Sequence, residues 1–159
     1  MGFIDPDKVP LRTGSRYPEP YASEMQGRAS LRFGDAGGLT QFGANLVILQ
    51  PGAKSSLRHW HRNEDEFVVV MLGECTLVQD AGETVLHQGD CAAFKAGDPD
   101  GHQFINKTAA EARFLVVGSK SKCEVATYSD VDLIQSIDYE NETAPVFTYK
   151  DGTPWSGPR

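Results

Sequence analysis

The sequence has no basic run and no long apolar stretch, and each absence excludes a class of partner. Fifteen Lys and Arg residues stand against 22 Asp and Glu, which gives a formal net charge of −7. Proteins that bind nucleic acid or an anionic membrane surface usually carry a basic face. No apolar stretch approaches the roughly 20 residues that a membrane-spanning helix needs. We therefore expect no nucleic acid and no membrane among the partners.

The sequence also lacks paired cysteines. Cys75, Cys91 and Cys123 form no Cys-x-x-Cys motif, which excludes a zinc ribbon and a thioredoxin-type motif. Because their number is odd, we expect reduced thiols that pack as small buried hydrophobic groups. Residues 1–10 carry charged side chains where a signal peptide has an apolar run. These features predict a cytoplasmic protein.

A long segment with helical periodicity is absent as well, and only residues 130–137 favour a short helix. Instead, 16 Gly and 9 Pro separate short apolar runs at a spacing of about ten residues, which is typical of a β-sandwich or barrel. The predicted strands are 31–33, 44–49, 57–61, 67–72, 75–78, 84–87, 91–94, 102–106, 113–117 and 123–127. The prediction is an all-β fold.

The chain divides into three parts by composition. Residues 1–29 are proline-rich and predict an extended arm, residues 30–127 predict the barrel, and residues 128–159 predict a C-terminal extension with one strand near 146–149. An arm or extension of this kind covers a sheet edge of its own barrel or of a partner. Residues 67–72 are apolar at every position, so we expect both faces of that strand to be covered. Together these features predict a homodimer.

The histidines supply the chemistry. His59 and His61 are one residue apart in a predicted strand, so both side chains leave the same face, about 6–7 Å apart. Glu66 opens the next strand, and His102 heads a later one; Glu64 and Asp65 compete with Glu66 as the carboxylate ligand. Three imidazoles and one carboxylate favour Fe, Mn, Ni or Zn over Ca or Mg. Since a His-x-His alone is more often surface decoration, the surrounding pattern decides.

That pattern resembles the two conserved motifs of the cupin superfamily. The first motif is matched in order by Gly52, His59, His61, Glu66 and Gly73, and the second by Gly89, Gly97, His102 and Asn106. The gaps before His59 and His102 are longer than usual, and Lys95 stands where proline is common, so the loops differ in shape. The six-residue gap from Glu66 to Gly73 matches the family and favours Glu66 over its neighbours.

The resemblance spans about residues 40–118 and is closest to small single-domain bacterial cupins. It implies a double-stranded β-helix, the cupin jelly-roll barrel, usually as a dimer. It also implies one divalent transition metal ion per chain, held by His59, His61, Glu66 and His102. Cupins with this ligand set resemble dioxygenases, decarboxylases and isomerases. The implied function is therefore a metal-dependent enzyme acting on an unidentified small molecule, and the alternative is a non-catalytic module that binds or senses one.

The sequence identifies no catalytic acid or base, although an isomerase needs one beside the metal. We expect His87 to face solvent and Asn106 to stabilise its own turn. Trp60 and Phe67 are expected to point away from the histidines, into the core or an interface. For three further side chains, a place at the barrel mouth and a surface or packing role both stay open: Tyr17, Gln103 and Arg113.

Overall fold

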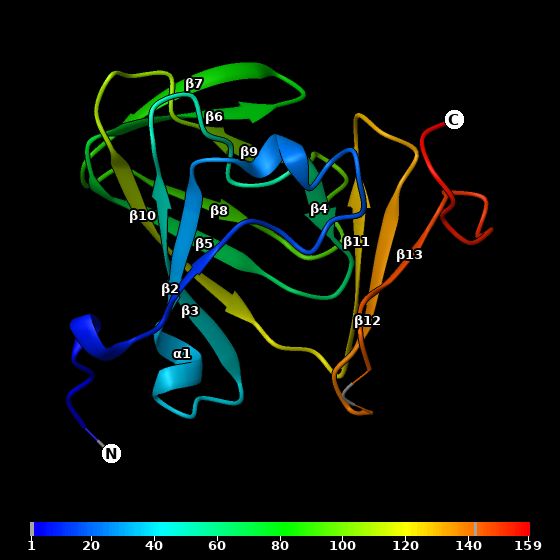
Figure 1. The fold of residues 1–159 in the computed structure, drawn as a ribbon, viewed down its shortest axis with the longest axis horizontal. Coiled ribbons are helices and arrows are strands. Elements are labelled where there is room, and N and C mark those ends of the chain that lie inside the picture. The colour runs from blue at the N-terminus through cyan, green and yellow to red at the C-terminus, as the bar shows by residue number, and fades with distance from the viewer. Residues whose placement is uncertain (1, 142) are drawn as a thin grey trace.

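The computed structural model describes residues 2–141 and 143–159, and it consists almost entirely of antiparallel strands (Figure 1). The strands are β1 (Leu11–Thr13), β2 (Arg28–Arg32), β3 (Phe42–Leu49), β4 (His59–His61), β5 (Glu66–Leu72), β6 (Glu74–Gln79), β7 (Gly82–His87), β8 (Cys91–Phe94), β9 (Gln103–Ile105), β10 (Ala112–Ser119), β11 (Cys123–Tyr128), β12 (Ile134–Asp138) and β13 (Val146–Thr148). The helical elements are η1 (Pro6–Lys8), η2 (Ser23–Met25) and α1 (Phe33–Ala36). The predicted all-β fold is confirmed.

The strands form three sheets. The large sheet has the order β1-β2-β3-β10-β5-β8, the C-terminal sheet has the order β13-β12-β11-β4, and the small sheet has the order β7-β6-β9. The C-terminal sheet lies beside the large sheet, and the small sheet closes one end of the barrel (Figure 1). The chain therefore crosses between sheets at β4 and β5, where the histidine pair and Glu66 lie.

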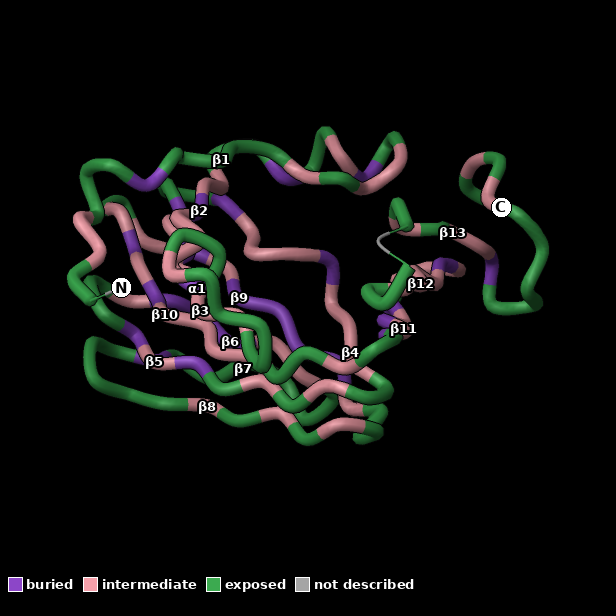
Figure 2. The backbone as a smooth tube through the Cα atoms, turned by 90° about the horizontal axis from the view of Figure 1, so that it is seen from below, coloured by how far each residue is buried: buried purple, intermediate pink, exposed green. Residues whose placement is uncertain are grey.

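The alternation along the strands explains where the core lies. In the large sheet, Val47, Val68, Val70 and Phe114 are at most 4% exposed and pack with Phe104 of the small sheet. A second apolar cluster lies between the C-terminal sheet and the segment that joins β1 to β2. It consists of Tyr21, Met25, Leu57, Ala126, Tyr128 and Leu133. Figure 2 shows this joining segment crossing from the large sheet toward the C-terminal sheet.

The turn after β5 depends on a glycine of the first motif. Gly73 has a φ of +72°, and a Cβ at this position would lie 2.7 Å from the carbonyl oxygen of Glu111. Any other residue would therefore be strained and would clash with the neighbouring backbone. This glycine fixes the tight turn between β5 and β6, which begins directly after the strand that carries Glu66.

Strand β5 is covered on one face only in a single copy of the chain, so the expectation of two covered faces is wrong at this level. Val68 and Val70 are buried, whereas Phe67 is 44% exposed and Met71 is 48% exposed. The two sets alternate along the strand and therefore belong to opposite faces. The apolar outer face is open to a partner.

The helix expected over residues 130–137 is also wrong. Residues 134–138 form β12, which pairs with β11 on one side and β13 on the other. At the start of this segment, the carboxylate of Asp130 accepts hydrogen bonds from Arg58 at 2.7–3.1 Å. The strand is stabilised by its two neighbours, and this tertiary pairing overrides the local preference.

The two flanks of the barrel join its sheets. The predicted arm contributes β1, which pairs with β2 at the edge of the large sheet, and the C-terminal extension contributes β12 and β13 to the C-terminal sheet. Strand β13 agrees with the predicted strand near 146–149. Both flanks thus cover edges of their own barrel.

The cysteines only partly follow their prediction. Cys75 is buried, but Cys91 and Cys123 are exposed, because they stand at the ends of strands and not in the apolar interior. All three thiols are free. Within the described residues, no helix is both long enough and apolar enough to cross a membrane.

Candidate metal centre

Backbone pairing places the four predicted side chains at one spot. His59 and His61 stand opposite Tyr128 and Ala126 of β11, so both point to the same face of the C-terminal sheet. His102 is bound directly across from His59, since their backbone amides donate to each other's carbonyls at 2.8 and 3.1 Å. Glu66 begins β5 on the same face as the buried Val68. All four side chains therefore point into the barrel.

The ligand atoms converge closely. Nε2 of His59 lies 3.2 Å from Nε2 of His61, whose Nε2 is 3.5 Å from Oε2 of Glu66. Nε2 of His102 lies 3.3 Å from Oε1 of Glu66, and all four groups offer ligand atoms within 4.8 Å of one another. A transition ion with ligands at 2.0–2.2 Å has neighbouring ligands about 3 Å apart when they are at right angles. The four side chains fit such an ion.

The hydrogen bonds of the imidazole rings leave ring nitrogens available to bind a metal ion. Nδ1 of His59 lies 2.9 Å from the carbonyl oxygen of Leu57, which can only accept, so Nδ1 carries the proton and Nε2 keeps its lone pair. Nε2 of His102 is buried and makes no hydrogen bond to the described residues. Phe94 stacks on the His102 ring at a centroid distance of 3.6 Å and fixes its plane. A buried imidazole nitrogen that lacks a hydrogen-bond partner and lies beside a carboxylate is what a bound cation would satisfy.

The charges at this spot favour a cation. Burial, together with the neighbouring His61 and His102, lowers the pKa of His59 to about 3, so His59 is neutral. Burial also acts to lower the pKa of His61, but hydrogen bonding to Glu124 and Glu66 outweighs it and raises that pKa to about 10. Burial raises the pKa of Glu66, yet its contacts with His102 and His61 outweigh this and lower it. Two carboxylates therefore attract positive charge to the His61 ring.

Glu124 is a site residue that the sequence interpretation missed. Its side chain is 2% exposed, and its Oε1 lies 3.6 Å from Nδ1 of His61. The same carboxylate accepts hydrogen bonds from the backbone amides of Arg62 at 2.8 Å and Asn63 at 3.0 Å. The signal was present in the sequence: Glu124, Ala126 and Tyr128 occupy every second position of β11 and therefore share its inner face. Glu124 holds the loop after β4 and orients the His61 ring.

The competing carboxylates lie elsewhere. Glu64 accepts hydrogen bonds from the backbone and hydroxyl of Ser121 and forms a second group with His61 and Glu124, within 4.8 Å. Asp65 accepts from the backbone amide of Ala96 at 2.8 Å, in the turn after β8. Only Glu66 shares the group formed by His59, His61 and His102.

His87 and Asn106 behave as predicted. His87 is exposed, with its Nδ1 3.3 Å from Glu74. Asn106 is fully buried and ties down its own turn, because its side-chain amide donates to the carbonyls of Leu49 and Ala110 and accepts from the backbone amide of Thr108. Neither residue approaches the candidate metal centre, which leaves the other three histidines as its imidazoles.

The remaining side chains differ in position. Phe67 lies on the open outer face of the large sheet, and Arg113 pairs there with Glu111 at 2.6 Å, away from the barrel mouth. Gln103 is buried and donates to the carbonyl of Ser56. Tyr17 lies inside, with its ring 5.4 Å from that of Tyr128. Of the three residues left open by the sequence, only Tyr17 is near the centre.

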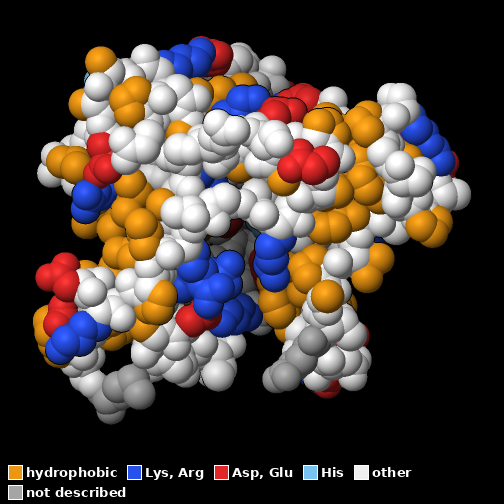
Figure 3. Space-filling model, viewed as in Figure 1, with side chains coloured by type: hydrophobic (Ala, Val, Ile, Leu, Met, Phe, Trp, Pro, Cys, Tyr) orange, Lys and Arg blue, Asp and Glu red, His pale blue; other side chains and the backbone are white. Residues whose placement is uncertain are grey.

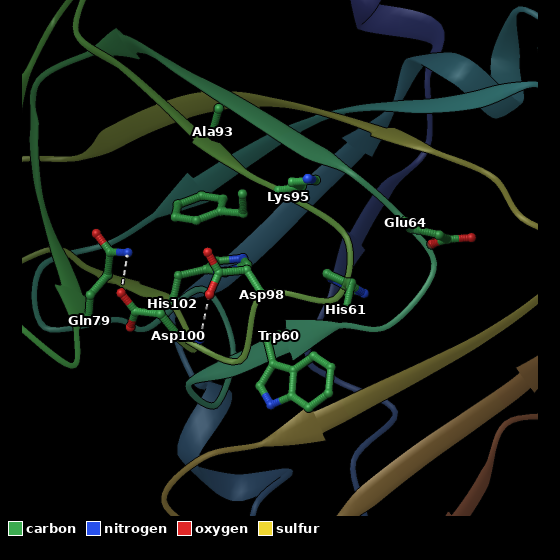
Figure 4. A pocket seen from close by; sticks show the side chains of 10 residues that line it. Trp60, His61, Glu64, Gln79, Ala93, Lys95, Asp98, Asp100 and His102 are labelled. Carbon is green, nitrogen blue, oxygen red and sulfur yellow. Dashed lines mark hydrogen bonds between the residues drawn. The ribbon is translucent and has the colours of Figure 1, made fainter.

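A pocket of about 130 Å³ leads to His61 and His102 (Figure 4). Trp60 borders this pocket, and its ring is directed away from His61 and His102, which agrees with the direction predicted for Trp60 (Figure 4). Gln79 donates a hydrogen bond to Asp100 at 3.1 Å on one side of the pocket. Its charged lining comprises Glu64, Lys95, Asp98 and Asp100, so this entrance is predominantly acidic.

Known proteins match the chain in family and in fold. Residues 45–118 match the family model described as Cupin domain. A crystal structure of a sugar phosphate isomerase of the cupin superfamily, from Silicibacter pomeroyi, is 54% identical, with 98% of this chain and 97% of that chain covered and a TM-score of 0.93. No curated protein matches the chain.

Two more distant structures show the fold alone. A protein from Acidithiobacillus ferrooxidans, for which sugar phosphate isomerase activity has been suggested, is 23% identical over 82% of this chain and 81% of its own, with a TM-score of 0.71. A polyketide cyclase from Streptomyces resistomycificus is 20% identical over 75% of this chain and 79% of its own, with a TM-score of 0.62.

Proposed function

The chain belongs to the cupin superfamily, with its double-stranded β-helix fold, and on that premise we propose that it is a metal-dependent enzyme. One divalent transition ion, Fe, Mn, Ni or Zn, would be held by His59, His61, Glu66 and His102. The observation that carries the proposal is the convergence of three imidazole Nε2 atoms and one carboxylate on a single buried point. Neutral imidazoles and a carboxylate are the ligands that such ions prefer.

The reaction that we propose is the isomerisation of a phosphorylated sugar. Its support is the 54% identical relative, which is described as a sugar phosphate isomerase. Interconversion of an aldose and a ketose moves a proton between neighbouring carbons beside a polarised carbonyl. The bound ion would supply the Lewis-acid polarisation. The chain itself must supply the group that carries the proton.

Glu64 is the carboxylate best placed to carry that proton. It lines the pocket that leads to His61, and it is not one of the four converging groups. Burial raises the pKa of Glu64, with a partial opposing effect from the hydrogen bond of the Ser121 backbone. A carboxyl group with a raised pKa accepts a proton more readily than an ordinary carboxylate and can return it in a later step.

Elemental analysis tests the metal site. Protein purified without a chelating tag should contain one transition ion per chain, and the double variant His59→Ala/His61→Ala should contain none, because two of four ligands are gone. His87→Ala is the matched control, since His87 lies on the surface, and it should keep the metal of the wild type. Stoichiometric metal in the double variant would overturn the assignment.

Proton exchange tests the reaction. The metal-loaded protein is incubated with a panel of aldose and ketose phosphates in D2O, and NMR follows interconversion and deuterium incorporation at the carbon beside the carbonyl. Glu64→Gln should lower kcat with little change in KM. Oxygen consumption or carbon dioxide release without isomerisation would replace this proposal with a dioxygenase or a decarboxylase. Binding without turnover would replace it with the non-catalytic module.

We also propose that two copies of the chain pair through the outer face of the large sheet. Leu31, Leu46, Leu115 and Val69 stand in register across β2, β3, β10 and β5 on the face opposite the core. Phe67 and Met71 extend this row and are 44% and 48% exposed. Contiguous apolar faces of this kind are normally covered by a partner. Sedimentation should show a dimer for the wild type and a monomer for Phe67→Glu, and a wild-type monomer at micromolar concentration would refute the pairing.

The location and the division of the chain stay predictions. A cytoplasmic location is supported by the three free thiols, which persist best in a reducing compartment. Cell fractionation with an antibody against the chain would test it. The division into an arm (1–29), a barrel (30–127) and an extension (128–159) predicts that limited proteolysis removes the arm and the extension before it degrades the barrel.

A further inference from the structure

Two arginines of β2 face into the barrel. Arg28 and Arg32 pair with Leu49 and Asn45 of β3. Asn45 in turn stands opposite Val116 of β10, which stands opposite the buried Val68 of β5. Residues opposite each other in an antiparallel ladder point to the same face. The two guanidinium groups therefore share the inner face of the large sheet with Glu66.

Arg28 is charged, half-buried and without an anion. Its Nε donates to the carbonyl oxygen of Ser55 at 2.6 Å, which leaves the two terminal nitrogens for another partner. Among the described residues, no carboxylate lies within ion-pair distance of Arg28 (Arg32, by contrast, has Asp35 at 3.6 Å). Burial lowers the pKa of Arg28, which reflects a cation that has lost solvent. A desolvated guanidinium is normally paired with an oxyanion.

Tyr17 links Arg28 to the candidate metal centre. Its ring packs against Tyr128, whose ring is 5.9 Å from that of His59. Burial raises the pKa of Tyr17, and the charge of Glu66 raises it as well. A hydrogen bond with Tyr128 and the charge of Arg28 act in the opposite direction. Arg28 and Glu66 thus both lie close enough to Tyr17 to act on it. A small molecule that touches both can bridge the arginine and the metal ligands.

The rim of this space is basic. Figure 3 shows a hollow near the middle of the molecule, between the β2–β3 side and the β11–β12 side, with Lys and Arg side chains beside it. The side chain of Arg32 on β2 is 38% exposed.

The pocket that leads to His61 and His102 cannot receive a phosphate as readily. There Glu64, Asp98 and Asp100 outnumber the single cation of Lys95. A phosphate dianion is repelled by such a lining and attracted by guanidinium groups, which bind its oxygens in pairs. The charge distribution thus orients a substrate with its anionic end toward β2.

We propose that Arg28 and Arg32 form a phosphate-monoester subsite that holds the phosphate group of the substrate inside the barrel. As a subsite for a sugar phosphate, the assignment rests on the proposed function. The sugar carbons would then lie between Arg28 and the group formed by His59, His61, Glu66 and His102, along the wall made by Tyr17 and Tyr128.

Calorimetry with inorganic phosphate tests the subsite directly. Arg28→Met and Arg32→Met should each weaken phosphate binding by about 10- to 100-fold, which is the effect of losing a hydrogen bond to a charged group. Arg28→Lys should recover only part of the affinity, because an ammonium keeps the positive charge but lacks the paired N–H donors of a guanidinium. Arg159→Met is the control: this arginine pairs with Asp151 in the C-terminal tail, and its loss should leave binding unchanged. Wild-type affinity in both methionine variants of β2 would overturn the subsite.

Enzyme kinetics distinguishes a failure of the phosphate subsite from a failure of the proposed function. With an active isomerase, both β2 variants should raise KM for a sugar phosphate by the same 10- to 100-fold and leave KM for the unphosphorylated sugar unchanged. If the protein isomerises no sugar, but its β2 variants lose phosphate binding, the proposed function is overturned and the subsite is supported. Unchanged KM in the variants of an active isomerase overturns the subsite alone. Because Arg32 is partly exposed, Arg32→Met gives this answer even if Arg28→Met does not fold.

Discussion

Replacing Glu124 with glutamine should weaken both the fold and the metal site. The carboxylate accepts two backbone hydrogen bonds, from Arg62 at 2.8 Å and Asn63 at 3.0 Å, and its side chain is 2% exposed. Glutamine offers one carbonyl oxygen, and its NH₂ group would face a second N–H donor. One buried, charge-assisted hydrogen bond is therefore lost, at a cost of about 1.5–3 kcal/mol. At roughly 2–4 °C per kcal/mol for a domain of this size, Tm should fall by about 3–12 °C.

The same change should lower metal affinity by about 10- to 100-fold, because Glu124 orients the His61 ring through Nδ1. Thermal unfolding of the metal-free protein and calorimetric titration with Zn²⁺ measure the two effects separately. Glu140→Gln is the matched control, since Glu140 is exposed and pairs with Lys122 at 2.9 Å on the surface. If Glu124→Gln unfolds within about 0.5 kcal/mol of the wild type and binds Zn²⁺ equally well, the role assigned to Glu124 is wrong.

Three further substitutions test other parts of the structure. Asn106→Ala should destabilise the protein by about 3 kcal/mol or more in urea unfolding, because it removes the buried side-chain hydrogen bonds to the carbonyls of Leu49 and Ala110 and from the amide of Thr108; a loss under 1 kcal/mol would contradict this. Arg58→Met should lower Tm at pH 7, because Arg58 bonds to Asp130 and holds its pKa below the usual range. A carboxylate with a lowered folded-state pKa contributes stability above its unfolded pKa of about 3.9 and loses it as pH falls. The Tm difference between Arg58→Met and the wild type should therefore shrink below pH 4, and a constant difference would argue against the ion pair. Lys95→Pro should leave the metal content unchanged in elemental analysis, because Lys95 is exposed after the end of β8, and loss of metal would show that this loop shapes the site.

Local patterns were enough to predict most strands and the shared face of the histidine pair, whereas Glu66 and His102 were assigned through the resemblance to the two cupin motifs. Alternation and turn residues reveal strands such as 44–49 and 123–127, and the spacing of His59 and His61 forces both rings onto one face. These features depend only on neighbours in the sequence. The helix expected over 130–137 failed because β12 owes its stability to β11 and β13, whose proximity no local pattern encodes.

The parts of the site that were missed depend on strand order. Glu124 reaches His61 because β11 pairs with β4, and Arg28 shares a face with Glu66 because β3 and β10 separate their strands in the large sheet. A charged residue at an inward position of a strand is the signal that was available in both cases. Interpreting it requires the register of strands far apart in the chain, and the sequence alone does not supply that register.

Tyr17 closes one side of the centre, yet it comes from the segment that joins β1 to β2. Its partners, Tyr128 and Phe147, lie near the other end of the chain. Bringing together segments so far apart in the sequence costs chain entropy, so we expect these contacts to form late in folding. The barrel can therefore assemble before its wall is complete. The nascent protein should acquire its secondary structure first and its ability to discriminate between ligands only when the N-terminal segment docks.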